Sequence, residues 1–332
     1  MNEHFESLLK LTPQLKEMAS QLKPDSTIHE FHDKIVSNLR LELPRHQVAA
    51  VFQLCYHTIK YYLNGCKDYV IMPAISDMLE NTSIDIEPTL LHSPFPEICI
   101  QPPHGYGSIW NQDTGWHKIT MMYISLEDED EGKQVRIMII GGKNKKSFTN
   151  LDDATYYFRC KMYDDKTVEQ SFKQAMGEYA KEGASAAYDV GLDNIMSSER
   201  YFKYCLNVLL YITSMNADME WKHVYPIHIE NRMKKLQDDK SINRLKKKNK
   251  ARKACVVGSN IILEPSKYVD PSGEDGEKWR LSKRVHVSGH YHGYWTGPRD
   301  GDRKLVKKWL APYWKGPDAA DQVHRKFQVG RE

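Results

Sequence analysis

Apolar side chains in the first eighty residues recur at the spacing of helix faces. Between residues 5 and 22 they return every three or four positions, which predicts an amphipathic helix. Thr27 and Glu30 have the spacing of a capping box and predict the start of a second helix. The same periodicity predicts further helices over 46–64 and 68–79.

The middle of the chain changes to short runs of β-branched and other apolar residues, which predict strands. Between two of these runs lie five acidic residues and a glycine, 127–132, which predict a solvated loop at the tip of a hairpin. Helices return over 167–181 and 198–215, and the second is so apolar that we expect it in the core. The predicted strands are 97–101, 118–126, 133–140 and 155–161.

The C-terminal part is rich in predicted strands, over 256–263, 283–292 and 304–314. The last two are joined by a Gly/Pro turn at 297–301. The fold class expected from the whole pattern is α+β. It comprises N-terminal helices, a central antiparallel sheet with packing helices, and a small basic β-rich C-terminal domain.

Charge divides the 332 residues into three parts. Residues 1–233 carry 23 basic and 32 acidic side chains, 234–253 carry 10 and 2, and 254–332 carry 14 and 10. We therefore predict an acidic body, a basic linker that is a mobile loop or a frayed helix, and a basic C-terminal domain. A basic run is either a solvated surface or a contact for a polyanion such as RNA. Its residues considered for RNA phosphates are Lys234, Lys235, Arg244, Lys246, Lys247, Lys248, Lys250, Arg252 and Lys253.

Several classes of protein are excluded by what the sequence lacks. The longest apolar stretch, 204–215, is shorter than the roughly 18 residues that a membrane-spanning helix needs. Residues 1–10 are polar, unlike a secretory signal, and the six cysteines are scattered, so we expect reduced thiols in a cytoplasm. Nucleotide-binding, zinc-finger and metalloprotease motifs are absent from the sequence, so we expect no cofactor and no metal.

The densest group of chemically versatile side chains is the sequence Gly-His-Tyr-His-Gly-Tyr-Trp at 289–295. Aromatic rings offer stacking faces and basic side chains offer phosphate donors, so this group fits single-stranded RNA or a partner. His290 and His292 could also act as base and acid on a ribose hydroxyl, which would make the protein a metal-independent ribonuclease. The residues predicted to bind RNA or a partner here are His290, His292, Tyr294, Trp295, Arg299, Lys304 and Trp309.

Two other roles fit the same residues. On one strand His286 shares the parity of His290 and His292, and three imidazoles on one face could hold Zn²⁺. Carboxylates and cysteines are absent nearby in sequence, which argues against a metal. Tyrosine and tryptophan are also ordinary core residues of a small sheet. From the residues alone, structural, RNA-binding and catalytic roles all stay open.

The segment from Gly289 to Pro298, with its basic flanks, resembles the C-terminal signature of a phage and mobile-element family, that of the second type V-A anti-CRISPR protein. The signature runs roughly R-G-H-W-H-x-Y-W-x-G, followed by a basic strand with a Trp and a Pro. Tyr291 stands where the family has a Trp, and Ser288 where it usually has an Arg. A weaker resemblance in the order of elements extends over the chain. The matching residues are Gly289, His290, His292, Tyr294, Trp295 and Gly297.

The resemblance implies an anti-CRISPR function with a particular mechanism. The founding member lowers production of a type V CRISPR nuclease by recognising its nascent N-terminal polypeptide and triggering loss of the messenger RNA during translation. The implied partners, in the cytoplasm of a bacterial host, are a nascent polypeptide, messenger RNA or the ribosome, and a host nuclease. The alternatives are a ribonuclease that uses His290 and His292, and a non-catalytic RNA- or ribosome-binding adaptor. If the acidic body holds the peptide, Trp110, Trp116 and Tyr123 are its candidate anchors.

Overall fold

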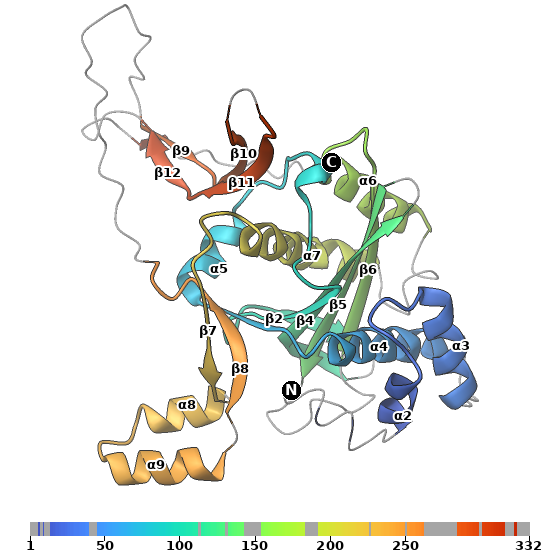
Figure 1. Cartoon of the computed structure of the whole chain (residues 1–332), viewed down its shortest axis with the longest axis vertical. Coiled ribbons are helices and arrows are strands. Elements are labelled where there is room, and N and C mark those ends of the chain that lie inside the picture. The colour runs from blue at the N-terminus through green and yellow to red at the C-terminus, as the bar shows by residue number, and fades with distance from the viewer. Residues whose placement is uncertain are drawn as a thin grey trace, which may run out of the picture.

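The protein has an α+β fold in which helices cover both faces of one large sheet (Figure 1). Two small sheets formed by C-terminal strands lie beside it. The computed structural model describes residues 6, 9, 14–39, 45–111, 114–129, 132–142, 154–182, 192–225, 227–249, 251–261, 284–298, 301–315 and 322–323.

The large sheet is mixed, where an antiparallel sheet was expected. Its strand order is β6-β5-β4-β2-β1-β8-β7, with β3 paired to β4, and β1 runs parallel to both β2 and β8. β1 begins the segment 68–79, which was wrongly predicted to be one helix. Alternation along β1 buries Tyr69 and Ile71, and Pro73 then opens a helix where its missing N–H costs nothing. The strands are β1 (Asp68–Ile71), β2 (Glu97–Gln101), β3 (Ser108–Asn111), β4 (Gly115–Glu129), β5 (Gly132–Gly142), β6 (Ala154–Met162), β7 (Met219–Val224) and β8 (Arg252–Val257).

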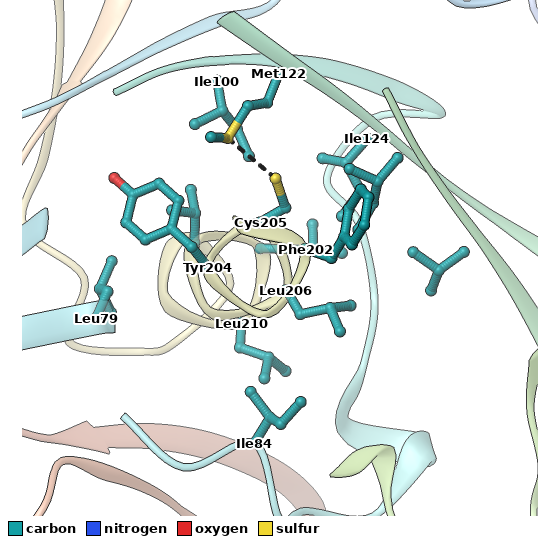
Figure 2. Packing of buried hydrophobic residues seen from close by; sticks show 14 of the residues in the cluster. Leu79, Ile84, Ile100, Met122, Ile124, Phe202, Tyr204, Cys205, Leu206 and Leu210 are labelled. Carbon is teal, nitrogen blue, oxygen red and sulfur yellow. Dashed lines mark hydrogen bonds between the residues drawn. The ribbon is translucent and has the colours of Figure 1, made fainter. Parts of the chain in front are cut away.

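One face of the sheet packs against α7, the helix predicted to lie in the core. Figure 2 shows Phe202 and Cys205 of α7 beside Met122 and Ile124 of the sheet. The polar Asn207 is fully buried in this helix, and its Nδ2 donates to the carbonyl oxygens of Leu79, in the last turn of α5, and of Thr82, just after α5. Between Tyr201 and Ile212 every side chain of α7 except that of Lys203 is buried, which confirms the prediction from the apolar sequence. The elements on this face are α5 (Pro73–Glu80), the 3₁₀ turn η1 (Pro88–Leu90), α6 (Val168–Glu182) and α7 (Leu192–Ile212).

The other face of the sheet is covered by α4, and the two preceding helices pack on α4 (Figure 1). Thr27 and Glu30 form the predicted capping box: each backbone N–H donates to the other side chain, at 2.6 and 3.3 Å. Thr167 and Gln170 repeat this arrangement before α6. Local sequence therefore fixes both helix starts. The N-terminal helices are α2 (Gln14–Ser20), α3 (Ile28–Leu39) and α4 (Arg45–Leu63).

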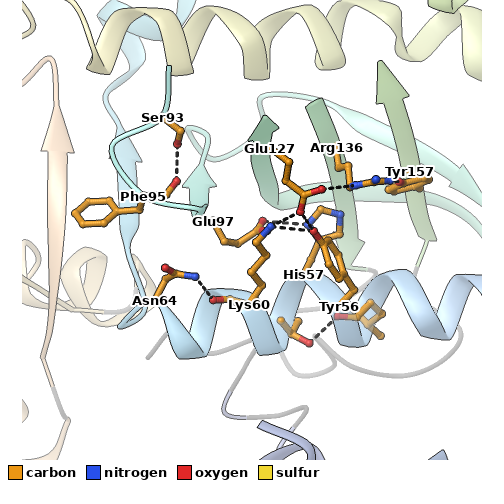
Figure 3. A network of polar contacts seen from close by, with 12 residues as sticks. Tyr56, His57, Lys60, Asn64, Ser93, Phe95, Glu97, Glu127, Arg136 and Tyr157 are labelled. Carbon is orange, nitrogen blue, oxygen red and sulfur yellow. Dashed lines mark hydrogen bonds and ion pairs between the residues drawn. The ribbon is translucent and has the colours of Figure 1, made fainter. Parts of the chain in front are cut away.

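A buried polar network joins α4 to the sheet (Figure 3). Glu127 of β4 accepts hydrogen bonds from Tyr56 and Lys60 of α4 and from Arg136 of β5. Burial alone raises the pKa of Glu127, but these partners, Lys60 above all, lower it to about 2. The prediction of a solvated loop at 127–132 is thus wrong for Glu127, because β4 continues through it to Glu129.

The C-terminal strands are shorter than predicted, because the two expected runs are each interrupted. The first run breaks at Gly289, where an added Cβ would lie 2.5 Å from Oγ1 of Thr82 and 3.2 Å from Cδ of Pro312. Only glycine fits this close approach to the body. The second run breaks at Pro312. The strands are β9 (Arg284–Val287), β10 (His290–Thr296), β11 (Lys304–Leu310), β12 (Tyr313–Lys315) and β13 (Gln322–Val323).

The basic stretch 234–253 lies mostly in regular structure. It follows α8 (Ile227–Met233), contains α9 (Asp239–Lys248) and ends in the first residues of β8. Asp238 caps α9 by accepting from the backbone N–H of Ser241 at 2.7 Å. Since β8 lies between β1 and β7, the large sheet continues across the predicted boundary. In the described part of the chain, no helix is both long and apolar enough to cross a membrane.

Candidate functional site: the C-terminal hairpin

The strands β10 and β11 form an antiparallel hairpin whose base is fixed to the body. The Tyr291 hydroxyl donates to the carbonyl oxygen of Asn207 at 2.8 Å. Trp309 exchanges two hydrogen bonds with the Asn216 side chain, at 2.8 and 2.9 Å, and its ring packs edge-on against Tyr211. These contacts, together with the close fit at Gly289, hold the hairpin in one orientation relative to α7.

Alternation separates the hairpin into two faces. The inner face carries Tyr291 and Trp309, both 6 % exposed, and Lys307, 2 % exposed. Trp309 was predicted to stack on RNA or a partner, and that prediction is corrected here, because a buried ring cannot receive a base. Farther from the body the same face becomes accessible, with Trp295 63 % exposed beside its cross-strand partner Leu305.

The outer face presents an aromatic and basic row. His290, His292 and Tyr294 follow one another, with ring centroids 6.3 and 5.3 Å apart. Lys308 pairs with His292, and Lys304 lies opposite Thr296 near the turn. His292, Tyr294, Lys304 and Lys308 are exposed. This row offers stacking faces and cations side by side, which is the combination that a single-stranded nucleic acid needs.

Among the described residues, no carboxylate forms a hydrogen bond or an ion pair with His290 or His292. Nδ1 of His290 lies 3.1 Å from the carbonyl oxygen of Ser288. His286 lies on β9, which belongs to a different sheet from the strand that carries His290 and His292, so the three histidines considered for zinc do not share one strand face. Within the described residues, no group of three His, Cys, Asp or Glu side chains could hold a metal ion.

Lys307 is a buried lysine that the predictions from sequence did not single out. Its Nζ donates to the carbonyl oxygen of Leu90 at 2.9 Å and to Oγ1 of Thr213 at 2.8 Å. Burial, and secondarily the charge of Lys133, lower the pKa of Lys307 to about 7. Lys307 therefore joins the hairpin to the body through hydrogen bonds to two neutral oxygen atoms.

This pKa makes the stability of the hairpin base depend on pH. Between about pH 7 and 10 the unfolded chain holds a proton on Lys307 that the folded protein has released, so stability increases as pH rises. The free energy of unfolding of the wild type, relative to that of Lys307→Met, should rise by up to about 1.4 kcal/mol per pH unit in this window. Urea unfolding at several pH values measures the difference, with Lys308→Met as the exposed control. A difference that does not vary with pH would contradict the burial of the charge.

The other predicted RNA-binding residues lie on a separate part of the molecule. Lys246, Lys247 and Lys248 are exposed on α9, and Lys253 is exposed on β8. Arg252 points to the opposite face of β8, where it contacts Gln101 and the buried Asp68. Lys234, Lys235 and Arg244 are exposed on or beside α8 and α9, and Lys250 and Arg299 lie outside the described residues.

The predicted peptide anchors are divided by the fold. Trp110 of β3 and Trp116 of β4 form an edge-on pair with ring centroids 5.4 Å apart, and Trp116 is 62 % exposed. Tyr123, in contrast, is fully buried beneath α4, where its ring meets that of Tyr61. The structure thus keeps two of the three aromatic residues together on a surface, and Tyr123 is corrected to a core residue.

Comparison with known proteins identifies the family. The model of the family described as "AcrVA2-like: Anti-CRISPR type V subtype A2 family" matches residues 69–317. The chain belongs to this anti-CRISPR family. The resemblance drawn from the C-terminal motif is therefore confirmed. The matched segment begins in β1 and includes the large sheet, α7 and the whole hairpin, while α2, α3 and α4 precede it.

The chain is also similar to a solved structure described as "Crystal structure of AcrVA2". The sequence identity is 11 %, the match covers 93 % of this chain and 96 % of that one, and the TM-score is 0.48. No curated protein matches the chain.

Proposed function

We propose that this anti-CRISPR protein recognises the nascent N-terminal polypeptide of a target protein and triggers loss of the messenger RNA that encodes it. The target is a type V CRISPR nuclease or another protein translated in the same bacterial host. Recognition of the polypeptide belongs to the body, and contact with messenger RNA or the ribosome belongs to the hairpin. A host nuclease, recruited in this process, removes the RNA.

The observation that carries the RNA-side assignment is the division of the hairpin into a buried base and an exposed row. The base is fixed by hydrogen bonds from Tyr291, Lys307 and Trp309, so its orientation is set before any partner binds. The row therefore loses little conformational freedom on binding, which favours affinity. Exposed Tyr294 and Trp295 have no packing role that requires large aromatic rings at the surface.

The peptide assignment is supported by the ring pair of Trp110, which is half-buried, and Trp116, which is exposed. At two positions the free edge of β3 cannot pair with a peptide strand, because tyrosine hydroxyls already form hydrogen bonds with its backbone groups. The Tyr201 hydroxyl forms hydrogen bonds with both the backbone N–H and the carbonyl oxygen of Ser108. The Tyr156 hydroxyl forms the same two hydrogen bonds with the backbone of Trp110. A peptide at this surface would therefore gain affinity from side chains seated against the two indoles, and not from strand addition.

Trp116→Ala should weaken peptide binding by about 30-fold or more, the loss of an aromatic interface anchor, while stability changes little because the ring is mostly exposed. The probe is a labelled synthetic peptide with the N-terminal sequence of a type V-A CRISPR nuclease, and the measurement is fluorescence anisotropy. Trp295→Ala, which removes an equally exposed indole from the hairpin, is the matched control and should bind the peptide normally.

If Trp116→Ala binds the peptide as tightly as the wild type does, the assignment of this surface is contradicted. If the wild-type protein does not bind the peptide at all, the nuclease is not its target. The full chain is required. A chain ending at Met233 would lack β8, which lies inside the large sheet.

A second candidate function is that of a ribonuclease. The neighbouring imidazoles of His290 and His292 are the observation that favours it, since two such groups could take and give a proton near neutral pH. We favour binding, because the row contains exposed aromatic residues and cations but no described carboxylate that orients either imidazole.

A further inference from the structure

A second aromatic and basic surface lies at the far end of the large sheet, around Trp221 of the edge strand β7. Nζ of Lys67 lies 4.5 Å from the ring centroid of Phe95 and 6.0 Å from that of Trp221. Nζ of Lys253, on the neighbouring strand β8, lies 5.9 Å from the same Trp221 centroid. We call Phe95, Lys67, Trp221 and Lys253 the Trp221 strip, in which aromatic rings and ammonium groups alternate.

Strand pairing explains why these side chains share one face. Trp221 pairs with Cys255 of β8, which in turn pairs with Tyr69 of β1, and the Tyr69 ring contacts the indole edge-on at 5.8 Å. Lys253 and Lys67 each precede these partners by two residues, so they point to the same side of the sheet. Because β7 is an edge strand, Trp221 remains 43 % exposed.

The strip carries positive charge that the described part of the protein does not neutralise. The acids of these strands are used on the opposite face: Asp68 pairs with Arg252, and Glu220 with Lys222. No described carboxylate forms an ion pair with Lys67 or Lys253. In Figure 1, α8 and α9 extend beyond the end of β7 and β8, and α9 leads directly into β8. The exposed lysines of α9 therefore add positive charge at the end of the sheet that carries the strip.

We propose that the Trp221 strip binds single-stranded RNA, with bases stacked on Trp221 and Phe95 and phosphates held by Lys67, Lys253 and the lysines of α9. Alternating rings and cations suit a strand whose bases are unpaired, because every base offers a face for stacking and every linkage a charge. An RNA duplex, whose bases are already paired and stacked, would contact only the lysines. The proposal adds an RNA-binding surface separate from the hairpin, and it rests on the proposed function for RNA as the partner.

The test uses the full-length protein and a labelled 12-nucleotide oligouridylate, with a 12-base-pair RNA duplex and polyglutamate as comparison probes. Trp221→Ala should weaken oligouridylate binding by about 5- to 150-fold, the loss expected for one stacked base, and should affect the duplex less. Lys253→Gln should reduce the magnitude of the log–log salt slope for the oligouridylate by about 0.7. Lys222→Gln, the same charge change on the opposite face of the neighbouring strand, is the matched control and should leave binding unchanged.

Thermal unfolding of each variant separates lost binding from lost structure, and Lys253→Gln tests the strip even if Trp221→Ala unfolds. Equal binding by Lys253→Gln, Lys222→Gln and wild type would overturn the proposal. Polyglutamate binding that depends on Lys253, with oligouridylate binding that ignores both Trp221 and Lys253, would overturn it in favour of an acidic protein partner. If variants of the strip still cause transcript loss in cells, the proposed function stands and only this inference is contradicted.

Discussion

Glu127→Gln is expected to lower the free energy of unfolding by about 3–5 kcal/mol, the cost of leaving the buried charges of Lys60 and Arg136 without their anionic partner. The amide would leave the ammonium of Lys60 and the guanidinium of Arg136 without the negative charge that both contact. Lys60 and Arg136 are nearly inaccessible, so water cannot replace the carboxylate well. Because Lys60 belongs to α4 and Glu127 to β4, the loss would loosen the N-terminal helices from the sheet (Figure 3).

Urea unfolding followed by circular dichroism measures this loss, and Asp128→Asn is the matched control. Asp128 is adjacent in β4, but its side chain is 89 % exposed, so its replacement should change stability by no more than about 0.5 kcal/mol. The effect of Glu127→Gln should also depend on pH. Since the pKa of Glu127 is lowered to about 2, its stabilisation is complete above the ordinary carboxyl pKa of about 4.3 and is lost as pH falls toward 2. Equal losses in the two variants would show that the network does not hold α4.

Combined replacement of Tyr294 and Trp295 by alanine should weaken RNA or ribosome association by at least about 10-fold. Each stacked base contributes about 1–3 kcal/mol, and both rings are exposed, so folding should be preserved. Replacement of His290 and His292 by alanine should weaken RNA or ribosome association no more than the replacement of Tyr294 and Trp295 does. The measurement is binding of purified protein to target messenger RNA and to ribosomes.

The same preparations distinguish binding from catalysis. Purified wild-type protein, mixed with target messenger RNA in the presence of a metal chelator and without host factors, should not cleave it. A ribonuclease that used the two histidines would cleave under these conditions and would lose about 10²–10⁴-fold in rate when either is replaced. Cleavage that depends on His290 or His292 would replace our account with the ribonuclease.

Local signals in the sequence predicted much of the fold. The capping boxes at Thr27 and Thr167 start helices where expected, because their hydrogen bonds involve only neighbouring residues. The strand 97–101 agrees with β2, and the apolar helix became α7. β1 was missed because four residues are too few for periodicity to decide, and its parallel neighbours β2 and β8 come from distant segments.

The functional residues were harder to place, because exposure is a property of tertiary structure. The motif at 289–295 marked the hairpin, yet the sequence did not reveal that Tyr291 and Trp309 face the body while Tyr294 and Trp295 face solvent. Because side chains alternate along a strand, Tyr294 and Trp295 lie on different faces of the hairpin. Both rings are nevertheless accessible, because this part of the hairpin lies away from the body. Of the Trp221 strip, the sequence analysis singled out only Lys253. The surface as a whole was missed, because its four residues are scattered in sequence and come together only in the folded sheet.

The central claim, that recognition of a nascent polypeptide leads to loss of its messenger RNA, is tested most directly by the transcript level of a type V-A CRISPR nuclease in cells that make this protein. Two versions of the nuclease gene are compared. One has synonymous codons throughout its N-terminal coding region. The other carries two compensating frameshifts there, so that the RNA is nearly unchanged but the N-terminal polypeptide is different. We predict that the protein lowers the transcript with synonymous codons as strongly as the natural one and leaves the frameshifted transcript intact. Loss of the frameshifted transcript, or persistence of the synonymous one, would contradict the account.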